Sequence, residues 1–201
     1  MYISWSGYNY FKIQNSQHSI VLNPYALDKN YKFGKVKSDI AIFTDPQKVA
    51  ECKLDEDVML IDSAGEYEAK DIFVYGRQTN GHLIYLIIFE DVRIAFLGEY
   101  GGQSLTDKDL ELVSGADILI TPVGGGEMAN AKQANSVIGQ IEPRIVIPSA
   151  YGVKELKNKA DSLEIFVKEF GVKVEEYDKF KVSTKDLPQD DMKLVVLKPQ
   201  L

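Results

Sequence analysis

Histidine and cysteine, the side chains that bind most transition metals in proteins, are scarce in this sequence. Its 201 residues include two histidines, His18 and His82, and one cysteine, Cys52. One cysteine excludes an internal disulfide and suits a reducing compartment, and two separated histidines cannot supply the clustered nitrogen and sulfur donors of a conventional zinc site. We expect both histidines to be exposed residues beside turns, and Cys52 to be a small, half-buried side chain.

Long apolar runs, an excess of basic residues and linker-like segments are also missing. The longest apolar run, residues 83–89, is far shorter than the roughly 20 residues of a membrane-spanning helix, and no basic region precedes an apolar stretch at the N-terminus, as a signal peptide requires. The net charge of −7, from 23 basic and 30 acidic residues, disfavours a nucleic-acid partner. We therefore expect one cytoplasmic domain, residues 1–201, with no nucleic-acid or membrane partner.

The apolar pattern predicts strands in the first half of the chain and alternating strands and helices in the second. β-Branched and aromatic runs bounded by Gly, Asn, Asp or Pro predict strands over residues 2–5, 10–14, 19–22, 39–43, 58–61, 67–75, 84–89 and 93–97, and later over 117–121, 144–147, 172–176 and 194–197. This order predicts an α/β (α+β) fold, a four-layer αββα sandwich of two mixed β-sheets.

Helix starts and ends are marked by local capping patterns. Thr106 with Asp109 forms a capping-box pattern before a helix over 107–113, and Asn130 precedes an amphipathic helix that extends to residue 141. A third helix is predicted over about 154–170, with Gly171 as its C-terminal cap. Asp45 followed by Pro46 predicts a further helix start, in which the Asp45 carboxylate accepts backbone N–H bonds.

Three sequence features carry candidate chemistry, and each also has a structural interpretation. The glycine turn 122–126 would offer backbone N–H groups to an anion, but it lacks the P-loop and GxGxxG patterns. Its structural interpretation is that glycine lets the backbone pass close beneath a neighbouring element. Glu99 lies between glycines at a strand end, where one carboxylate is not a site by itself. Ser63 and Ser149 have no Gly-x-Ser-x-Gly turn and no histidine placed as a base, which argues against a serine hydrolase.

Six stretches stand out together by their order and spacing. They are ISWSGYNYFKI (3–13), VLNPY (21–25), GEYE (65–68), LGE (97–99), ITPVGG (120–125) and IEPRIVIP (141–148). In this order they resemble the bacterial metallo-β-lactamase-fold hydrolases, in particular the branch of small, predicted zinc-dependent hydrolases. The resemblance extends from residue 1 to about residue 197, and it implies the αββα sandwich that the order of elements also predicts.

The metal ligands that this resemblance implies are replaced. The family carries a His-x-His-x-Asp-His motif after a strand, here residues 39–43, and the matching residues are Asp45, Gln47, Val49 and Ala50. The Gly-His-Ser opening of the branch is Gly7-Tyr8-Asn9, and the Asp-Pro that follows it is Asn23-Pro24.

The remaining ligand positions are replaced in the same way. Glu99 stands for the bridging aspartate of a Leu-Gly-Asp segment, and the last ligand, in Ile-Pro-Met-His-Tyr, is matched to Ser149. A further family histidine precedes a strand, whereas His82 is expected to begin the strand itself. Glu99 is therefore the only carboxylate that the resemblance retains.

Loss of the histidines argues against the family's chemistry, because zinc must be held by such ligands to activate water. Our leading hypothesis is a catalytically degenerate metallo-β-lactamase-fold protein with no zinc or other cofactor. It would be a binding, regulatory or partner subunit, in a homo-oligomer or in a hetero-oligomer with an active relative.

Two other hypotheses stay open. The first is a metal-dependent hydrolase of phosphodiester or ester bonds, with a rebuilt carboxylate-based site around Asp45 and Glu99. Its further candidate residues are Tyr8, Gln47, Ser149 and Tyr151, and Asp45, Gln47 and Glu99 could hold a hard cation such as Mg²⁺ or Ca²⁺. The second is a small-molecule binder that uses the glycine turn 124–126, with a ligand that the sequence does not identify.

Overall fold

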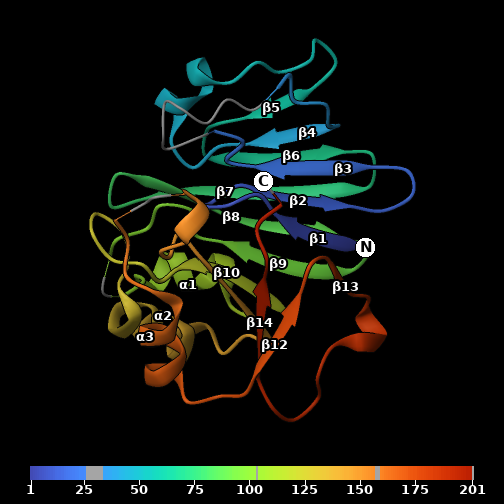
Figure 1. The fold of residues 1–201 in the computed structure, drawn as a ribbon. Coiled ribbons are helices and arrows are strands. Elements are labelled where there is room, and N and C mark those ends of the chain that lie inside the picture. Colours follow the sequence, from blue (N-terminus) through green and yellow to red (C-terminus); the bar gives the residue numbers. More distant parts are fainter. Residues whose placement is uncertain (26–33, 103, 157–158, 201) are drawn as a thin grey trace.

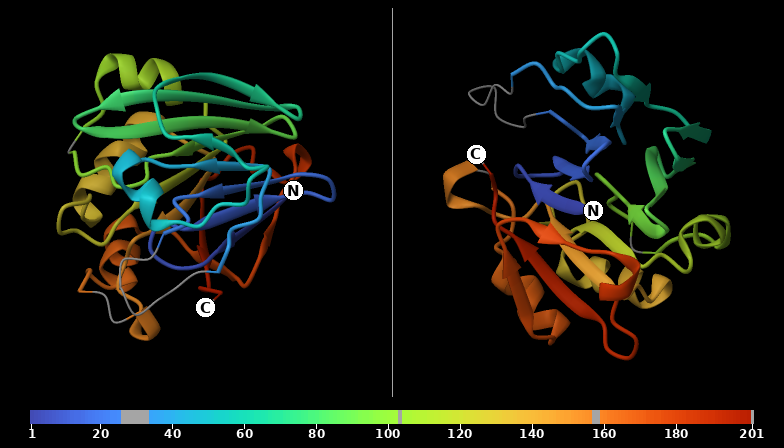
Figure 2. Two further views of the ribbon diagram at one scale, coloured as in Figure 1. Left: turned by 90° about the horizontal axis from the view of Figure 1, so that it is seen from above. Right: turned by 90° about the vertical axis from the view of Figure 1, so that its right-hand side faces the viewer.

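The strands form two mixed sheets that pack face to face (Figures 1 and 2). The computed structural model describes residues 1–25, 34–102, 104–156 and 159–200. This arrangement confirms the predicted sandwich of two mixed sheets with helices. None of the helices in these ranges combines the length and hydropathy that a membrane span requires.

The first sheet has six strands in the order β13-β1-β2-β3-β4-β5. Neighbours are antiparallel from β13 to β3 and parallel from β3 to β5. The strands are β1 (Tyr2–Trp5), β2 (Phe11–Gln14), β3 (Ser19–Leu22), β4 (Ile40–Ile42), β5 (Met59–Ile61) and β13 (Phe180–Lys181).

The second sheet has eight strands in the order β12-β14-β11-β10-β9-β8-β7-β6. Neighbours are parallel from β12 to β9 and antiparallel from β9 to β6. The strands are β6 (Gly65–Ala69), β7 (Ile72–Thr79), β8 (His82–Phe89), β9 (Val92–Phe96), β10 (Ile118–Pro122), β11 (Ile145–Ser149), β12 (Val174–Tyr177) and β14 (Lys193–Leu197).

The α-helices lie beside the eight-stranded sheet, away from the six-stranded one (Figure 2). They are α1 (Asp107–Val113), α2 (Ala131–Ile141) and α3 (Leu163–Phe170), and the 3₁₀-helices are η1 (Pro46–Glu51), η2 (Lys154–Leu156) and η3 (Thr184–Asp186). Helix α1 contacts β7 and β8, α2 contacts β10, and α3 packs on α2. The predicted capping box at Thr106 and the predicted N-terminal cap at Asn130 are both present, and Asn130 also forms a capping box with Gln133. Gly171 caps α3 in the left-handed conformation.

The core between the sheets contains a contiguous set of aromatic rings. Trp5 lies 4.8 Å from Tyr151 and 6.2 Å from Phe11, measured between ring centroids, and Phe11 packs edge-on against Phe96 of the other sheet at 6.5 Å. Trp5, Phe11 and Phe96 are fully buried. These contacts join the two sheets, because Phe11 belongs to β2 and Phe96 to β9.

Several predicted elements differ from the structure. The predicted strand 67–75 is wrong, because Lys70 and Asp71 adopt left-handed backbone angles and form the turn between β6 and β7. The predicted helix 154–170 is also wrong, since the described residues contain the short η2 and then α3, and residues 157–158 lie outside the described part. Strand β13 was not predicted.

The two histidines are half-buried instead of exposed, which corrects the expectation for both. His18 lies in the turn between β2 and β3, where its side chain is 28% exposed. His82 begins β8, as predicted. Cys52 is half-buried as expected, and burial raises the pKa of its thiol to about 11, which leaves it protonated at neutral pH.

Candidate functional site

Glu99 is the centre of a polar network formed by loops at one end of the sandwich. It follows β9 and the left-handed Gly98. The hydroxyl of Tyr8, after β1, donates to Oε1 of Glu99 at 3.2 Å, and the hydroxyl of Tyr25, after β3, donates to the same oxygen at 2.8 Å. Tyr25 is only 2% exposed, and Glu99 is half-buried. Two phenols from the first sheet therefore hold a carboxylate from the second.

The environment keeps both phenols protonated. Burial raises the pKa of Tyr8 well above its ordinary value, and the charge and hydrogen bond of Glu99 raise it further. Burial and then Glu99 raise the pKa of Tyr25 in the same way, with a smaller contribution from Asp45. A phenolate beside a carboxylate is electrostatically unfavourable, so both tyrosines act as hydrogen-bond donors and neither is a base at neutral pH.

A second pair of residues fixes the loops beneath Glu99. The side-chain amide of Asn23 donates to Oγ1 of Thr44 at 2.7 Å, and the backbone N–H of Thr44 donates back to Oδ1 of Asn23 at 2.8 Å. Both residues are buried. A Cβ on Gly98 would lie 2.3 Å from the Thr44 side chain, so only glycine fits there and the Glu99 loop packs directly on this pair.

Ser149 is buried and is not placed as a nucleophile. Its hydroxyl donates to Oδ1 of Asn9 at 2.6 Å, and the amide of Asn9 contacts the sulfur of Met128 at 3.6 Å. An amide cannot remove the serine proton, so this pair connects the first loop to the end of β11 and has no acid–base function. When the family's Ile-Pro-Met-His-Tyr segment is aligned residue by residue with this sequence, its histidine falls on Ala150, one residue beyond Ser149. The methyl group of alanine has no atom that could bind a metal.

Backbone strain is concentrated at these loops. Tyr8, Asn23 and Ala150 have φ angles of 52°, 44° and 56°, in the left-handed region that residues other than glycine rarely adopt. The carbonyl of Tyr8 accepts bonds from the indole N–H of Trp5 and the backbone N–H of Ala150, both at 2.9 Å. Such strain persists only where surrounding contacts hold it, and it is common at binding sites.

The loop after β4 forms the predicted helix start. Oδ1 of Asp45 accepts the backbone N–H of Gln47 at 2.9 Å, and Pro46 is the first residue of η1, a 3₁₀-helix. Gln47 and Ala50 are exposed, and Val49 packs against a small buried cluster below the loop. The structure therefore brings together Tyr8 and Glu99, with Asp45 nearby, while Gln47 points to solvent and Ser149 belongs to a separate buried pair.

These side chains do not fit zinc. Zinc sites use imidazole and thiolate ligands in tetrahedral sets, whereas Glu99 accepts two phenols, Asp45 caps a helix and Ser149 donates to an amide. In the described ranges no three His, Cys, Asp or Glu side chains are grouped so that they could hold a metal ion.

Two other predicted features lie away from this network. A Cβ on Gly124 would lie 2.1 Å from the carbonyl oxygen of Ala150, so the glycine turn serves close backbone passage, as its structural interpretation holds. Tyr151 packs on Trp5 and donates to the carbonyl of Leu197 at 3.3 Å. Neither feature contributes a side chain to the Glu99 network.

The fold and the position of its loop network define a metallo-β-lactamase-fold protein. A sequence profile of the beta-lactamase superfamily domain matches residues 2–150, and the chain belongs to this family. A UPF0173 protein of Pyrococcus furiosus is 25% identical over 201 aligned residues, which cover 83% of this chain and 94% of that protein.

Two solved structures share the fold. A proposed Zn-dependent hydrolase of the metallo-β-lactamase superfamily from Thermotoga maritima superimposes with a TM-score of 0.83 at 23% identity, covering 98% of this chain and 100% of that chain. A metallo hydrolase from Ignicoccus hospitalis gives a TM-score of 0.64 at 12% identity, over 98% of this chain and 95% of that chain. At these identities the likeness shows the fold alone.

Sequence reasoning found Glu99, Tyr8 and the Asp45 cap but missed the role of Tyr25 and the Asn23–Thr44 and Asn9–Ser149 pairs. The signal in the sequence was the pair Asn23-Pro24, which occupies the position where the family branch of small, predicted zinc-dependent hydrolases has Asp-Pro. It showed that this position had changed, but it did not show that Asn23 pairs with Thr44.

Proposed function

We propose that this chain is a metallo-β-lactamase-fold protein that acts by binding, as a regulatory or partner subunit, and does not hydrolyse substrates with zinc. The observation that carries this proposal is the Tyr8–Glu99–Tyr25 network. Oε1 of the one carboxylate retained from the family's site accepts two protonated phenols. The two donors, Tyr8 and Tyr25, lie in loops where residues of the family's metal site are replaced. We infer that hydrogen bonds between side chains take the place of the metal site.

Metal content tests the proposal directly. The protein would be produced in zinc-supplemented medium, purified without chelator and analysed by mass spectrometry, with the Thermotoga maritima relative prepared in parallel as the comparator. We expect less than about 0.1 zinc ions per chain, because the donor set lacks imidazole and thiolate. A content of about one or two zinc ions per chain would overturn the proposal.

Hydrolase assays distinguish the rebuilt-site hypothesis. We expect no turnover of bis(p-nitrophenyl) phosphate or p-nitrophenyl acetate above the rate of Glu99→Ala, with Mg²⁺, Ca²⁺ or Zn²⁺ added. If the wild-type protein hydrolysed either substrate, and if Glu99→Ala and Asp45→Ala each abolished that turnover, the function would be carboxylate-based hydrolysis and not binding.

The partner version of the proposal has its own test. Light scattering after gel filtration measures homo-oligomer formation, and affinity purification from cells that encode the protein tests for an active relative. Recovery of a second metallo-β-lactamase-fold chain in a fixed ratio supports a hetero-oligomer. A monomer that never recovers such a chain argues for a protein that binds a small ligand.

A further inference from the structure

Near the β6 edge of the eight-stranded sheet, the outer face of the sheet carries apolar side chains that are only partly covered. Phe73 of β7 is paired with Glu68 of β6 and with Ile88 of β8, and side chains paired in this way lie on one face. Phe73 and Ile88 are half-buried, whereas the neighbouring Val74 and Ile87, on the opposite face, are fully buried. Phe73 and Ile88 therefore point away from the core between the sheets.

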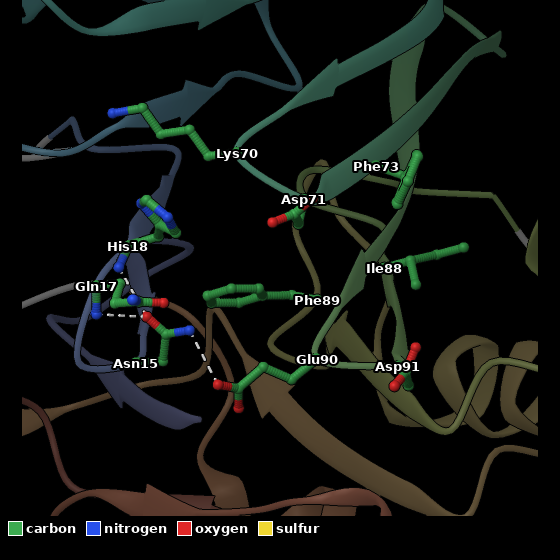
Figure 3. Close-up of a pocket in the computed structure, with 10 residues that line it drawn as sticks. All are labelled: Asn15, Gln17, His18, Lys70, Asp71, Phe73, Ile88, Phe89, Glu90 and Asp91. Atoms are coloured by element: carbon green, nitrogen blue, oxygen red, sulfur yellow. Dashed lines mark hydrogen bonds between the residues drawn. The ribbon is translucent and has the colours of Figure 1, made fainter.

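Neither side chain has a place in the hydrophobic core. Figure 3 shows Phe89 directed toward the β2–β3 turn of the first sheet, and Phe73 and Ile88 on the other side of these strands. Within the described ranges, Phe73 and Ile88 are absent from both clusters of buried apolar side chains and from the side chains that pack against them. Apolar surface in this position gains free energy when another surface covers it.

The apolar surface continues into a groove between the sheet and α1. The groove has a volume of about 560 Å³, and it is lined by Tyr75 of β7 and Leu112 of α1, which are both half-buried. Tyr75 lies on the same face as Phe73, because side chains two residues apart on a strand point to one side. Together Phe73, Tyr75, Ile88 and Leu112 form one apolar surface, the outer patch.

Carboxylates predominate around the outer patch. Those on β6, in the β6–β7 and β8–β9 turns and on α1 are all exposed: Glu66, Glu68, Asp71, Asp91 and Glu111. The nearby bases are Lys108 and Arg93, together with Arg77 and Lys70, which are paired with Asp109 and Asp39. The carboxylates outnumber the bases that lack such a pairing among the described residues, so a positively charged partner complements this rim.

We propose that the outer patch binds an amphipathic helix of a partner protein, with apolar residues on one face and lysine or arginine beside them. The apolar residues cover Phe73, Tyr75 and Ile88, and the bases face the carboxylates of the rim. A helix fits here because α1 and α2 already cover the same sheet farther from the β6 edge. The proposal extends the partner role proposed above to a named surface, and it makes no use of the Glu99 network.

A second copy of this chain is a poorer occupant of the outer patch. Two copies would bring the same carboxylates together, and the chain carries a net charge of −7. Like charges that face one another across an interface oppose association. The sign of the charge therefore selects a basic segment of another protein.

Binding of designed peptides tests the proposal. Three helical peptides of about 16 residues share one leucine face and carry Lys, Gln or Glu at the flanking positions. Fluorescence anisotropy at about 50 mM salt, where surface charges are weakly screened, measures their affinity for the wild-type protein. We expect the Lys peptide to bind about tenfold more tightly than the Gln peptide, and the Glu peptide to bind least.

Variants of the outer patch and its rim locate the binding surface. Phe73→Thr and Ile88→Thr remove apolar surface but keep a residue that suits a strand, and Glu68→Lys reverses a charge on the rim. The threonine variants should weaken binding of the Lys peptide by about fivefold or more, and Glu68→Lys by about threefold. Ile165→Thr and Glu169→Lys, at exposed residues of α3, are the matched controls and should change it by less than about twofold.

Circular dichroism establishes which variants are folded, and Glu68→Lys still tests the surface if a threonine variant is not. Equal affinities for the three peptides, or Lys-peptide binding that the folded variants of the patch and rim leave unchanged, would overturn the proposal. So would a wild-type dimer that dissociates in Phe73→Thr, because a second copy would then occupy the patch. Zinc has no part in this assay, so its failure leaves the metal-content test of the proposed function unaffected.

Discussion

At the scale of single residues, Glu99 holds two loops of the first sheet through one oxygen atom. Hydrogen bonds to an ionised group are worth about 1.5–3 kcal/mol when buried, and less where water reaches the carboxylate. Tyr25 is nearly fully buried and bonds at 2.8 Å, whereas Tyr8 is half-buried and bonds at 3.2 Å. The two phenols should therefore contribute unequally.

The prediction is that Tyr25→Phe lowers the free energy of unfolding by about 1–2 kcal/mol and Tyr8→Phe by about half as much. Urea unfolding at pH 7 measures both. Tyr75→Phe is the control, because Tyr75 is also half-buried and its hydroxyl has no hydrogen bond among the described residues. A larger loss from Tyr8→Phe than from Tyr25→Phe would contradict this ranking.

At the scale of elements, Asp109 fastens α1 to β7. It is 1% exposed, and its carboxylate accepts bonds from Arg77 Nε at 2.9 Å, Thr79 Oγ1 at 2.8 Å and Thr106 Oγ1 at 2.6 Å. Burial alone would raise the pKa of this carboxyl, but the hydrogen bonds from Thr106, Thr79 and Arg77 outweigh it and lower the pKa. The charged form therefore stabilises the helix–sheet contact.

Replacement of Asp109 by Asn should cost about 2 kcal/mol or more at pH 7, because it removes the charge that buried donors face. Because the pKa of Asp109 is lowered in the folded protein, the stabilisation that its charge provides is fully present above the unfolded carboxyl pKa of about 3.9. This stabilisation is lost as pH falls through the pKa of the folded state. The difference between wild type and variant should therefore shrink below about pH 4.

Urea unfolding from pH 7 down to pH 3 follows this difference. Asp107→Asn, in the exposed first turn of the same helix, is the control and should change stability little at pH 7. A cost for Asp109→Asn that stays constant down to pH 3 would show that shape, and not charge, is what Asp109 provides.

Elements set by nearby residues were predictable from the sequence, and elements set by distant contacts were not. Helices α1 and α2 begin at capping boxes whose members are three residues apart. The predicted helix 154–170 is interrupted because the backbone N–H of Asp161 donates to Gly124 and its carbonyl accepts from Gly152, which draws the chain toward the glycine turn. No periodicity within 154–170 indicates those partners.

The candidate site divides in the same way. The Asp45 cap was predictable because its acceptor and donor are two residues apart, and Glu99 was found from its glycine neighbours. Tyr25 is 74 residues from Glu99, so their hydrogen bond exists only once both sheets have formed. The turn at Lys70 and Asp71 was missed because this pair is not the Asn-Gly or Asp-Gly pair that usually marks a two-residue hairpin turn, and lysine seldom adopts left-handed angles.

At the scale of the whole molecule, the two sheets interlock through both ends of the chain. Strand β1 pairs with β13, and the backbone N–H of Gln200 donates to the carbonyl of Trp5 at 2.7 Å. The aromatic contacts of Trp5, Phe11, Phe96 and Tyr151 join the sheets at the same place. Neither the strand-rich first half nor the helix-containing second half can lose its structure without exposing this shared core.

The chain should therefore unfold as one cooperative domain. Trp5 is the only tryptophan and is fully buried, so its fluorescence reports the contact between the sheets, while far-UV circular dichroism reports all elements. We expect the two transitions to coincide in urea, and Phe96→Ala to shift both equally, by about 3–5 kcal/mol. A Trp5 transition at lower urea than the loss of secondary structure would show that the sheets separate first, and that the interlocked ends do not make them one unit.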